Sequence, residues 1–269
     1  MAEVKKLNGF LGARIDGLDF SVGLRVNDYD LIRGALAEHH VVCVAAEKMT
    51  PSQHKELACR FGTPEEHAFF THLGEGAEHI TVLDSEAGDR ADMWHSDEQF
   101  LSRPPTFTFT QAQRLPPYGG ETAFISLCAV YESLSSGLRQ YLEGLTAVHD
   151  YGVIVDMSWQ LGLITEEQVA LASQTPQRAE HPLVVEHPPS RRRAVFLSPT
   201  YTRFIRGLPM GEASMLKEFL LQHMLKPEFQ YRHRWAAGDL MIWDNRCTLH
   251  YALNDYSAPR LMHRISVME

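Results

Sequence analysis

Residues 106–110 read Thr106-Phe107-Thr108-Phe109-Thr110, a strict alternation of polar and apolar side chains. Successive side chains of an extended strand point to opposite faces of a sheet, so both phenylalanines share one face and the threonines share the other. The pattern predicts a half-buried strand, and such alternation favours antiparallel pairing. The stretch therefore predicts a sheet that packs one face on a hydrophobic core.

Other short β-rich runs surround this strand. They span residues 80–83, 122–125, 183–186, 194–197, 229–235, 240–243 and 260–267. With residues 106–111 they predict two facing sheets, and helices expected at 131–145 and 211–225 interrupt them. We therefore expect a mixed α+β fold with a mainly-β core, namely a double-stranded β-helix, or jelly roll, with flanking helices.

The first third of the chain has the clearest helix signals. Apolar residues recur at helical spacing within residues 29–38, and a strand is expected at 41–45. Residues 50–53 read Thr-Pro-Ser-Gln, which supplies an N-cap, a proline at the first helical position and a capping glutamine. This signature predicts a second helix, which closes at Gly62.

The composition is that of an ordinary globular protein. The chain has 269 residues, 44% of them hydrophobic and 22% charged, and it shows no linker, low-complexity tract or repeat. We therefore expect a single domain over residues 1–269. The stretch 151–181 is long and carries mixed signals, and we expect it to be a lid insertion over a site.

Charge, cysteine usage and hydropathy bound the partners and the location. The formal net charge is -9 and the basic run 191–193 is short, so we expect no nucleic-acid partner. The four cysteines lack paired spacing, and the first ten residues lack the apolar stretch of a secretion signal. No apolar run approaches the ~20 residues that span a bilayer. These features predict a cytoplasmic protein with reduced thiols and no membrane partner.

His95-Ser96-Asp97, together with the distant His250, forms the pattern His-x-Asp followed by His. Two imidazoles and one carboxylate can occupy one face of a divalent ion and leave other positions open for an organic ligand and dioxygen. In an extended segment, residues two apart point the same way, so His95 and Asp97 can converge on one ion. Most of the 14 histidines are expected in packing or surface roles. Residues 54–56 repeat the spacing inside a predicted helix, where the side chains diverge.

Arg260 and Arg264 are a second candidate set. Period two places both on one face of the strand expected at 260–267, ~13 Å apart at roughly 3.3 Å per residue, which suits two different anions. The alternative is a pair of solvated charges. Because Ile265 and Val267 make the opposite face apolar, we expect the arginine face to line a cavity, where guanidinium groups need anionic partners.

These motifs occur in a recognisable order, and the chain resembles the TauD/TfdA group of iron(II)- and 2-oxoglutarate-dependent dioxygenases over nearly its whole length. The resemblance is carried by residues 12–19, Trp-His-Ser-Asp at 94–97, Gly-Gly-Glu-Thr at 119–122, Trp-Asp-Asn-Arg at 243–246, and His250. It implies a jelly-roll enzyme that uses iron(II), 2-oxoglutarate and dioxygen. It also implies a homodimer or homotetramer that hydroxylates a small organic anion and releases succinate and carbon dioxide.

The resemblance further implies roles for individual residues. They are His95, Asp97 and His250 for iron, Thr122 and Arg260 for the far carboxylate of 2-oxoglutarate, and Arg264, His67 and Phe70 for the primary substrate. Phe70 and Ala91 fall where taurine dioxygenase carries a tyrosine and an asparagine, so taurine itself is disfavoured. A carboxylate or sulfonate with an apolar body is expected instead.

Several other outcomes stay open at this point. The oxidation could end in hydroxylation, in cleavage after hydroxylation, or in desaturation within a biosynthetic pathway. A zinc hydrolase could use the same three ligands, but it would leave Arg260 and Thr122 without a role. A non-catalytic, anion-binding jelly roll is disfavoured because every expected ligand is intact. Halogenation is disfavoured because halogenating relatives lack the carboxylate ligand, and Asp97 is present.

Overall fold

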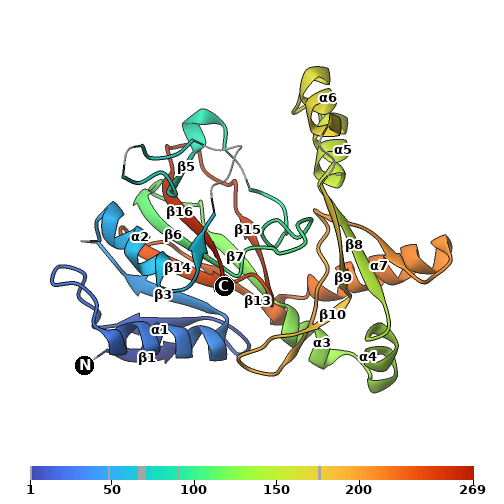
Figure 1. Ribbon diagram of the computed structural model, residues 1–269, viewed down its shortest axis with the longest axis horizontal. Coiled ribbons are helices and arrows are strands. Elements are labelled where there is room, and N and C mark those ends of the chain that lie inside the picture. The colour runs from blue at the N-terminus through green and yellow to red at the C-terminus, as the bar shows by residue number, and fades with distance from the viewer. Residues whose placement is uncertain (1, 48, 66–70, 75, 90, 175–176) are drawn as a thin grey trace. The chain divides into compact units, whose positions relative to one another are not determined.

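The structure is a computed structural model that describes residues 2–47, 49–65, 71–74, 76–89, 91–174 and 177–269 (Figure 1). The chain divides into two compact units. Unit 1 comprises Met1–Asp92, Pro105–Ser126 and Gln230–Glu269, and unit 2 comprises Met93–Pro104 and Leu127–Phe229. Each unit therefore draws on distant parts of the sequence. The single domain over residues 1–269 stays a prediction.

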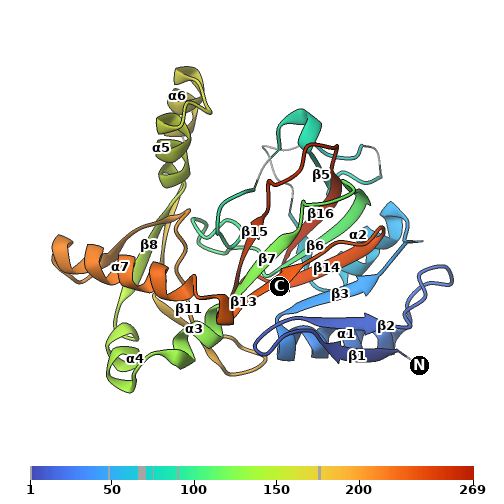
Figure 2. The same ribbon diagram turned by 180° about the vertical axis from the view of Figure 1, so that it is seen from behind.

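Unit 1 is built on two sheets. The larger has the strand order β1-β2-β3-β14-β6-β16-β4, with β5 also paired to β16, and the smaller has the order β13-β7-β15 (Figure 2). The strands are β1 (Glu3–Lys6), β2 (Ala13–Asp16), β3 (Val41–Ala45), β4 (Thr63–Pro64), β5 (Thr81–Asp84), β6 (Phe107–Arg114), β7 (Thr122–Ser126), β13 (Gln230–His233), β14 (Asp239–Asp244), β15 (Thr248–Ala252) and β16 (Leu261–Met268). Both neighbours of β6 run antiparallel to it, as its alternation predicts.

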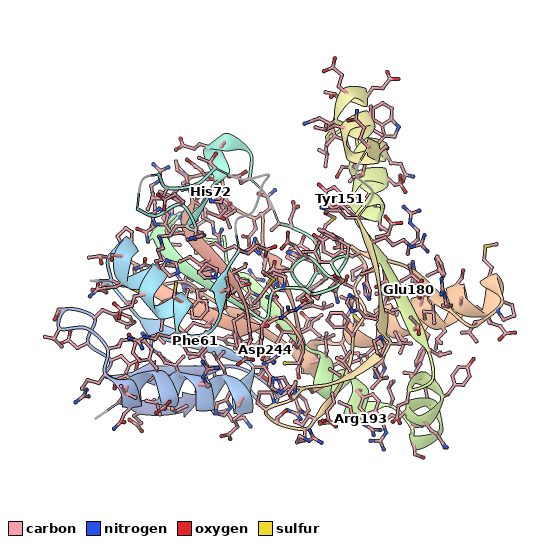
Figure 3. All side chains as sticks on the ribbon, in the orientation of Figure 1. Phe61, His72, Tyr151, Glu180, Arg193 and Asp244 are labelled. Carbon is pink, nitrogen blue, oxygen red and sulfur yellow. The ribbon has the colours of Figure 1, made fainter. Side chains whose placement is uncertain are left out.

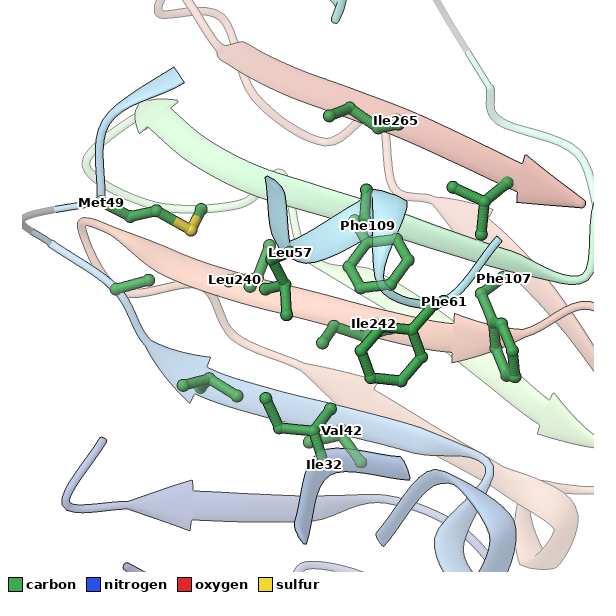
Figure 4. Close-up of a cluster of buried hydrophobic side chains, with 14 of the residues drawn as sticks. Ile32, Val42, Met49, Leu57, Phe61, Phe107, Phe109, Leu240, Ile242 and Ile265 are labelled. Carbon is green, nitrogen blue, oxygen red and sulfur yellow. The ribbon is translucent and has the colours of Figure 1, made fainter. Parts of the chain in front are cut away.

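Strand β6 confirms the face assignment but not the degree of burial. Phe107 and Phe109 enter the main core, where Phe61 packs edge-on against both at centroid distances of 5.8 and 5.3 Å (Figure 4). The opposite face is covered too, because Thr108 is 0% exposed. Its hydroxyl bonds with Ser266 Oγ over 3.1 Å and accepts from the amide of Asn245 over 2.9 Å. The expectation of a half-buried strand is wrong, since threonine can be buried once its hydroxyl is satisfied.

Helices α1 (Val26–His39) and α2 (Pro51–Cys59) supply side chains to the same core. Thr50 caps α2 through the predicted capping box, in which its hydroxyl accepts from the Gln53 amide over 3.3 Å. The helix ends at Cys59, three residues before the predicted Gly62. Gly62 instead lies against the chain's last strand, where an added Cβ would meet the Met268 carbonyl. A short 3-10 helix, η1, spans Ser85–Ala87.

Unit 2 combines small sheets with helices. One sheet has the order β12-β8-β9, and β10 pairs with β11. Its elements are α3 (Leu127–Ser133), α4 (Ser136–Leu142), β8 (Thr146–Asp150), α5 (Gly152–Gln160), α6 (Glu166–Gln174), β9 (Arg178–Pro182), β10 (Val184–Glu186), β11 (Arg193–Val195), β12 (Thr202–Arg206), α7 (Met210–Met224) and the 3-10 helix η2 (Pro227–Phe229). The broad prediction of a mixed protein of helices and many strands is confirmed.

One prediction for unit 2 needs correction. The single helix expected at 131–145 is two helices, because Ser135 accepts from the Leu138 amide over 3.3 Å and so caps α4 as a separate element. The stretch 151–181 holds α5, α6 and most of β9, and neither helix has a buried residue among those described. Its role as a lid stays a prediction.

The surface features that bear on partners are modest. The basic run at 191–193 is balanced by glutamates of unit 2, through the ion pairs Arg191 with Glu186, Arg192 with Glu132, and Arg193 with Glu143 (Arg193 is labelled in Figure 3). Arginines paired with glutamates have little net charge with which to attract a polyanion. The absence of a nucleic-acid partner stays a prediction. Within the described residues, no helix has both the length and the hydropathy needed to cross a bilayer.

Buried histidines predict a loss of stability in acid. His54 on α2 and His149 on β8 are both 0% exposed. Burial, aided by nearby His263, lowers the pKa of His54 to about 3, and burial, aided by nearby His181, does the same to the pKa of His149. Since an unfolded histidine has a pKa near 6.5, the unfolded chain takes up protons first as the pH falls. Stability should therefore drop between about pH 6.5 and 3, by up to about 1.4 kcal/mol per pH unit for each histidine.

Urea unfolding at a series of pH values measures this slope. Replacing one of these histidines by glutamine, His54→Gln, should flatten the slope below about pH 6.5 relative to the wild type. An unchanged slope in the variant would mean that His54 is not held neutral in the folded protein.

Candidate active site

The ligand segment of unit 2, residues 93–104, carries His95 and Asp97. His95 Nε2 lies 3.8 Å from Asp97 Oδ1, and the two side chains are 13% and 3% exposed. His95 Nδ1 donates to the Met93 carbonyl oxygen over 2.7 Å, because a carbonyl oxygen can only accept. A neutral imidazole protonated on Nδ1 presents a lone pair at Nε2, the form that binds a metal. The prediction that residues 95 and 97 point the same way is confirmed.

The competing pair in α2 behaves as expected of a helix. His54 is fully buried in unit 1, whereas Glu56, two positions on, is exposed. The two side chains diverge, so residues 54–56 do not form a ligand pair.

Contacts within unit 2 fix the ligand segment on both sides of Asp97. Thr200 Oγ1 donates to the Trp94 carbonyl over 2.8 Å. The ring nitrogen Nε2 of His181 lies 3.1 Å from the Gln99 carbonyl oxygen and 2.9 Å from that of Leu101. Two carbonyl acceptors require the proton of His181 to reside on Nε2. These contacts hold in place a segment that has no regular secondary structure of its own.

His250 belongs to unit 1 and lies in the middle of β15. It pairs with Phe124 of β7 across the ladder and is 6% exposed. Its ring packs against the indole of Trp243, with the centroids 4.7 Å apart. The turn at residues 245–247 precedes β15, so His250 lies two residues inside the strand that follows it.

Thr122 and Arg260 lie close to a common aromatic side chain in unit 1. Thr122 is the first residue of β7, and its Oγ1 accepts from the indole Nε1 of Trp235 over 3.0 Å. The guanidinium carbon of Arg260 lies 5.9 Å from the centroid of the same indole ring. The two residues proposed for one carboxylate therefore share a neighbour.

Arg260 is a cation with little to balance it. Its Nε donates to the Gly120 carbonyl over 3.1 Å. Burial lowers the pKa of Arg260, while the nearby Tyr256 hydroxyl raises it. Among the carboxylates that the structure describes, none forms an ion pair with Arg260. A guanidinium removed from water without an acidic partner favours the binding of an anion from solution.

Gly119 and Gly120 shape the approach to Arg260. Both have positive φ, 74° and 68°, a conformation that L side chains rarely adopt. A Cβ added to Gly120 would lie 3.1 Å from the Arg260 Cδ and 3.2 Å from the Tyr256 ring. This backbone conformation, without a side chain at residue 120, lets the Gly120 carbonyl come close enough to accept from Arg260.

Arg264 lies on β16, on the face opposite Ile265 and Val267, both of which enter the main core. Its Nη2 donates to Ser266 Oγ over 3.1 Å. The prediction of an apolar opposite face is confirmed. His67 and Phe70, the other predicted substrate contacts, lie outside the described residues.

A further cluster of potential metal ligands lies in unit 1, and sequence reasoning missed it. Cys43, His233 and Asp239 are all buried, with potential ligand atoms within 4.8 Å of one another. A cationic side chain is already present, because Arg14 Nη1 lies 3.4 Å from both Cys43 Sγ and Asp239 Oδ1. Burial opposes ionisation of Asp239, but hydrogen bonds from His233 and the Ala236 amide hold its pKa below the usual range. We interpret the cluster as a hydrogen-bonded ion pair and not a metal site.

Comparisons with known proteins identify the family of this chain. Residues 3–266 match the family described as "Taurine catabolism dioxygenase TauD, TfdA family". The alkylsulfatase of Acinetobacter baylyi is 31% identical over 98% of this chain and 84% of its own length. The alpha-ketoglutarate-dependent sulfate ester dioxygenase of Pseudomonas putida is 31% identical over 98% of this chain and 89% of its own length.

A solved structure supports the same relationship. AAD-2 in complex with Mn(II) and N-oxalylglycine superposes with a TM-score of 0.81 at 28% identity, covering 100% of this chain and 97% of that one. A family match over almost all of the chain and relatives above 30% identity along its length leave one interpretation. The chain belongs to the TauD/TfdA family and is a 2-oxoglutarate-dependent dioxygenase.

Proposed function

We propose that this enzyme binds iron(II) and oxidises a C–H bond in a small organic sulfate ester, sulfonate or carboxylate, with a sulfate ester as the favoured substrate. Hydroxylation of the carbon that bears the ester oxygen gives a hemiacetal sulfate, which collapses to an aldehyde and inorganic sulfate. In the same turnover, 2-oxoglutarate and dioxygen are converted to succinate and carbon dioxide, with one oxygen atom entering the substrate. The proposed fold is the jelly roll expected from the sequence.

The observation that carries the proposal is Arg260, a partly buried guanidinium without an acidic partner among the described residues, which shares the Trp235 indole as a neighbour with the Thr122 hydroxyl. The indole of Trp235 donates to Thr122 Oγ1, so the hydroxyl proton of Thr122 is directed elsewhere. A fork of guanidinium donors and one hydroxyl donor suit the far carboxylate of 2-oxoglutarate.

His95, Asp97 and His250 are the proposed iron ligands. The donor set fits the ion, because the Nε2 of His95 is held unprotonated and Asp97 lies beside it with a buried carboxylate. Two imidazoles and a carboxylate are the set typical of non-haem iron oxygenases. When bound, the metal supplies the site at which dioxygen and 2-oxoglutarate generate the oxidant. The protein's part is to place the substrate's C–H bond and to keep the ligands in position.

Arg264 is the proposed partner of the substrate's anionic head group, and His67 and Phe70 are proposed as further substrate contacts. The two relatives that act on sulfate esters support the choice of this head group. Family membership contradicts the zinc hydrolase and the non-catalytic binder, whereas desaturation remains the alternative outcome. A homodimer or homotetramer in the cytoplasm is the proposed state of the enzyme.

The proposal is tested with a panel of alkyl sulfates, alkyl sulfonates and aryloxyalkanoates. Substrate-dependent formation of succinate should be greatest with a sulfate ester, accompanied by equimolar aldehyde and sulfate. If only a carboxylate or only a sulfonate stimulates succinate formation, the substrate belongs to that class and is not a sulfate ester. If no anion stimulates succinate formation, the proposed substrate class is wrong.

Arg264→Gln should raise the KM for the anionic substrate by about 10- to 100-fold, since a hydrogen bond to a charged group contributes roughly 1.5–3 kcal/mol. The affinity for 2-oxoglutarate should stay unchanged. Arg264→Lys is the matched variant and should recover part of the loss, because it retains the charge but not the planar fork. A change confined to 2-oxoglutarate affinity would mean that the roles of Arg264 and Arg260 are reversed.

A further inference from the structure

Trp235 contacts both residues proposed to hold the far carboxylate of 2-oxoglutarate. Its Nε1 donates to Thr122 Oγ1 over 3.0 Å, and its ring lies near the Arg260 guanidinium, 5.9 Å from Cζ to centroid. Trp235 follows the end of β13 at His233, so no strand pairing fixes its direction. Other contacts must therefore orient the indole.

The nearest such contact is His233. In the ladder, His233 stands directly opposite Thr122. Its ring meets the Trp235 indole nearly at a right angle, with centroids 5.1 Å apart and an interplanar angle of 83°. His233 is only 5% exposed. An edge-to-face contact with a buried ring restrains the indole only if the histidine ring is itself fixed.

Both ring nitrogens of His233 have partners. Nε2 lies 3.2 Å from Asp239 Oδ2, and Nδ1 lies 3.0 Å from the Tyr231 hydroxyl. The carboxylate of Asp239 can only accept, so Nε2 carries a proton. Burial raises the pKa of Tyr231 and keeps its hydroxyl protonated, so that hydroxyl can donate to Nδ1. This arrangement sets one tautomer and one orientation of the ring.

Asp239 also fixes the backbone beside Trp235. Its Oδ2 accepts from the Ala236 amide over 2.8 Å, and its own amide donates to the Ala236 carbonyl over 3.0 Å. Its Oδ1 accepts from Arg14 Nη1 over 3.4 Å. The carboxylate thus restrains both the histidine ring beneath the indole and the peptide that follows it.

We propose that His233 and Asp239 are positioning residues for 2-oxoglutarate. They hold Trp235 so that its indole N–H occupies an acceptor lone pair of Thr122 and directs the Thr122 hydroxyl proton to the far carboxylate. Neither residue touches the cosubstrate. This inference rests on the proposed function, because it assigns Thr122 and Arg260 to 2-oxoglutarate.

The test compares Trp235→Phe, which removes the N–H but keeps a ring near Arg260, with His233→Gln and Thr122→Val. Each variant should raise the Kd of 2-oxoglutarate by about tenfold, the size of one hydrogen bond's contribution, with kcat at saturating cosubstrate little changed. The double variant Trp235→Phe with Thr122→Val should bind 2-oxoglutarate as tightly as Thr122→Val alone, because both substitutions remove the same interaction.

Cys43→Ala is the matched control for general loosening. Cys43 is buried with its Sγ 3.9 Å from His233 Nε2, so its loss loosens the packing around that ring but leaves the contact of the ring with Asp239 in place. The substitution should lower the melting temperature and leave the Kd of 2-oxoglutarate unchanged. If Cys43→Ala raises the Kd of 2-oxoglutarate as much as His233→Gln does, the effect comes from general loosening of the structure and His233 is not a positioning residue.

A second readout does not require turnover or metal. The protein has four tryptophans, and Trp235→Phe identifies the indole N–H signal of Trp235 in a nitrogen–proton correlation spectrum of the metal-free protein. That signal should shift in Thr122→Val and in His233→Gln and stay in place in Cys43→Ala. Unchanged 2-oxoglutarate affinity in Trp235→Phe, with a loss in Thr122→Val, would overturn the inference. Failure of the wild type to bind 2-oxoglutarate would instead overturn the proposed function.

Discussion

Asp97→Ala is expected to reduce turnover to less than about a hundredth of the wild-type rate while the protein stays folded. Asp97 supplies the only carboxylate of the proposed ligand set, and even partners that merely orient metal ligands contribute 10- to 100-fold. The carboxylate is buried beside His95, so its loss leaves an imidazole without its neighbour but removes no core side chain. Succinate formation and iron content measure the effect.

The matched control is Asp92→Ala. Asp92 lies close in sequence and accepts from Asn254 at an exposed position, so its removal should leave both iron content and turnover near wild type. Circular dichroism of both variants should resemble the wild type. Turnover retained in Asp97→Ala would exclude Asp97 from the ligand set and with it the proposed iron site.

Arg260→Ala should chiefly weaken the binding of 2-oxoglutarate. Loss of one partner from a buried ion pair typically costs about 3–5 kcal/mol, which corresponds to two to four orders of magnitude in Kd. Titration with 2-oxoglutarate in the absence of oxygen measures this directly. Arg260→Lys should recover part of the affinity, since it restores the charge without the bidentate geometry.

Arg114→Ala serves as the control for this variant. Arg114 is an exposed arginine whose Nη2 lies 2.6 Å from Glu86 Oε2, and such surface pairs contribute about 1 kcal/mol or less. Its removal should leave 2-oxoglutarate affinity unchanged. Equal losses in Arg260→Ala and Arg114→Ala would point to long-range charge and not to a specific carboxylate contact.

The sequence predicted elements whose signals are local. The strand at 41–45 has the predicted bounds, and the capping box at Thr50 forms as expected, because a few neighbouring residues determine each. The pairing of His95 with Asp97 also follows from local backbone geometry. The face assignment of Phe107 and Phe109 succeeded for the same reason, since alternation alone decides it.

Features that depend on distant partners were missed. Strand β15 forms because Thr248–Ala252 pairs with Thr122–Ser126, far away in sequence, and this ladder encloses His250. Thr108 is buried because Ser266 and Asn245 satisfy its hydroxyl. Neither partner can be read from a run of residues taken alone.

The roles of Tyr231, His233 and Trp235 were likewise missed, although one signal was present. The three residues alternate with arginines at period two, which places their side chains on a common face of the strand expected there. Their contact with Thr122 requires the register of β13 with β7, which composition does not specify.

Strand β16 serves two purposes at once. One face presents Arg264, with Arg260 directly before the strand, and the other places Ile265 and Val267 in the main core. A library aimed at new substrates that varied the whole strand would therefore discard many members through misfolding before selection acted. Substitutions are better confined to alternate positions on the arginine face. The core face then keeps the protein folded while the enzyme evolves activity on new substrates.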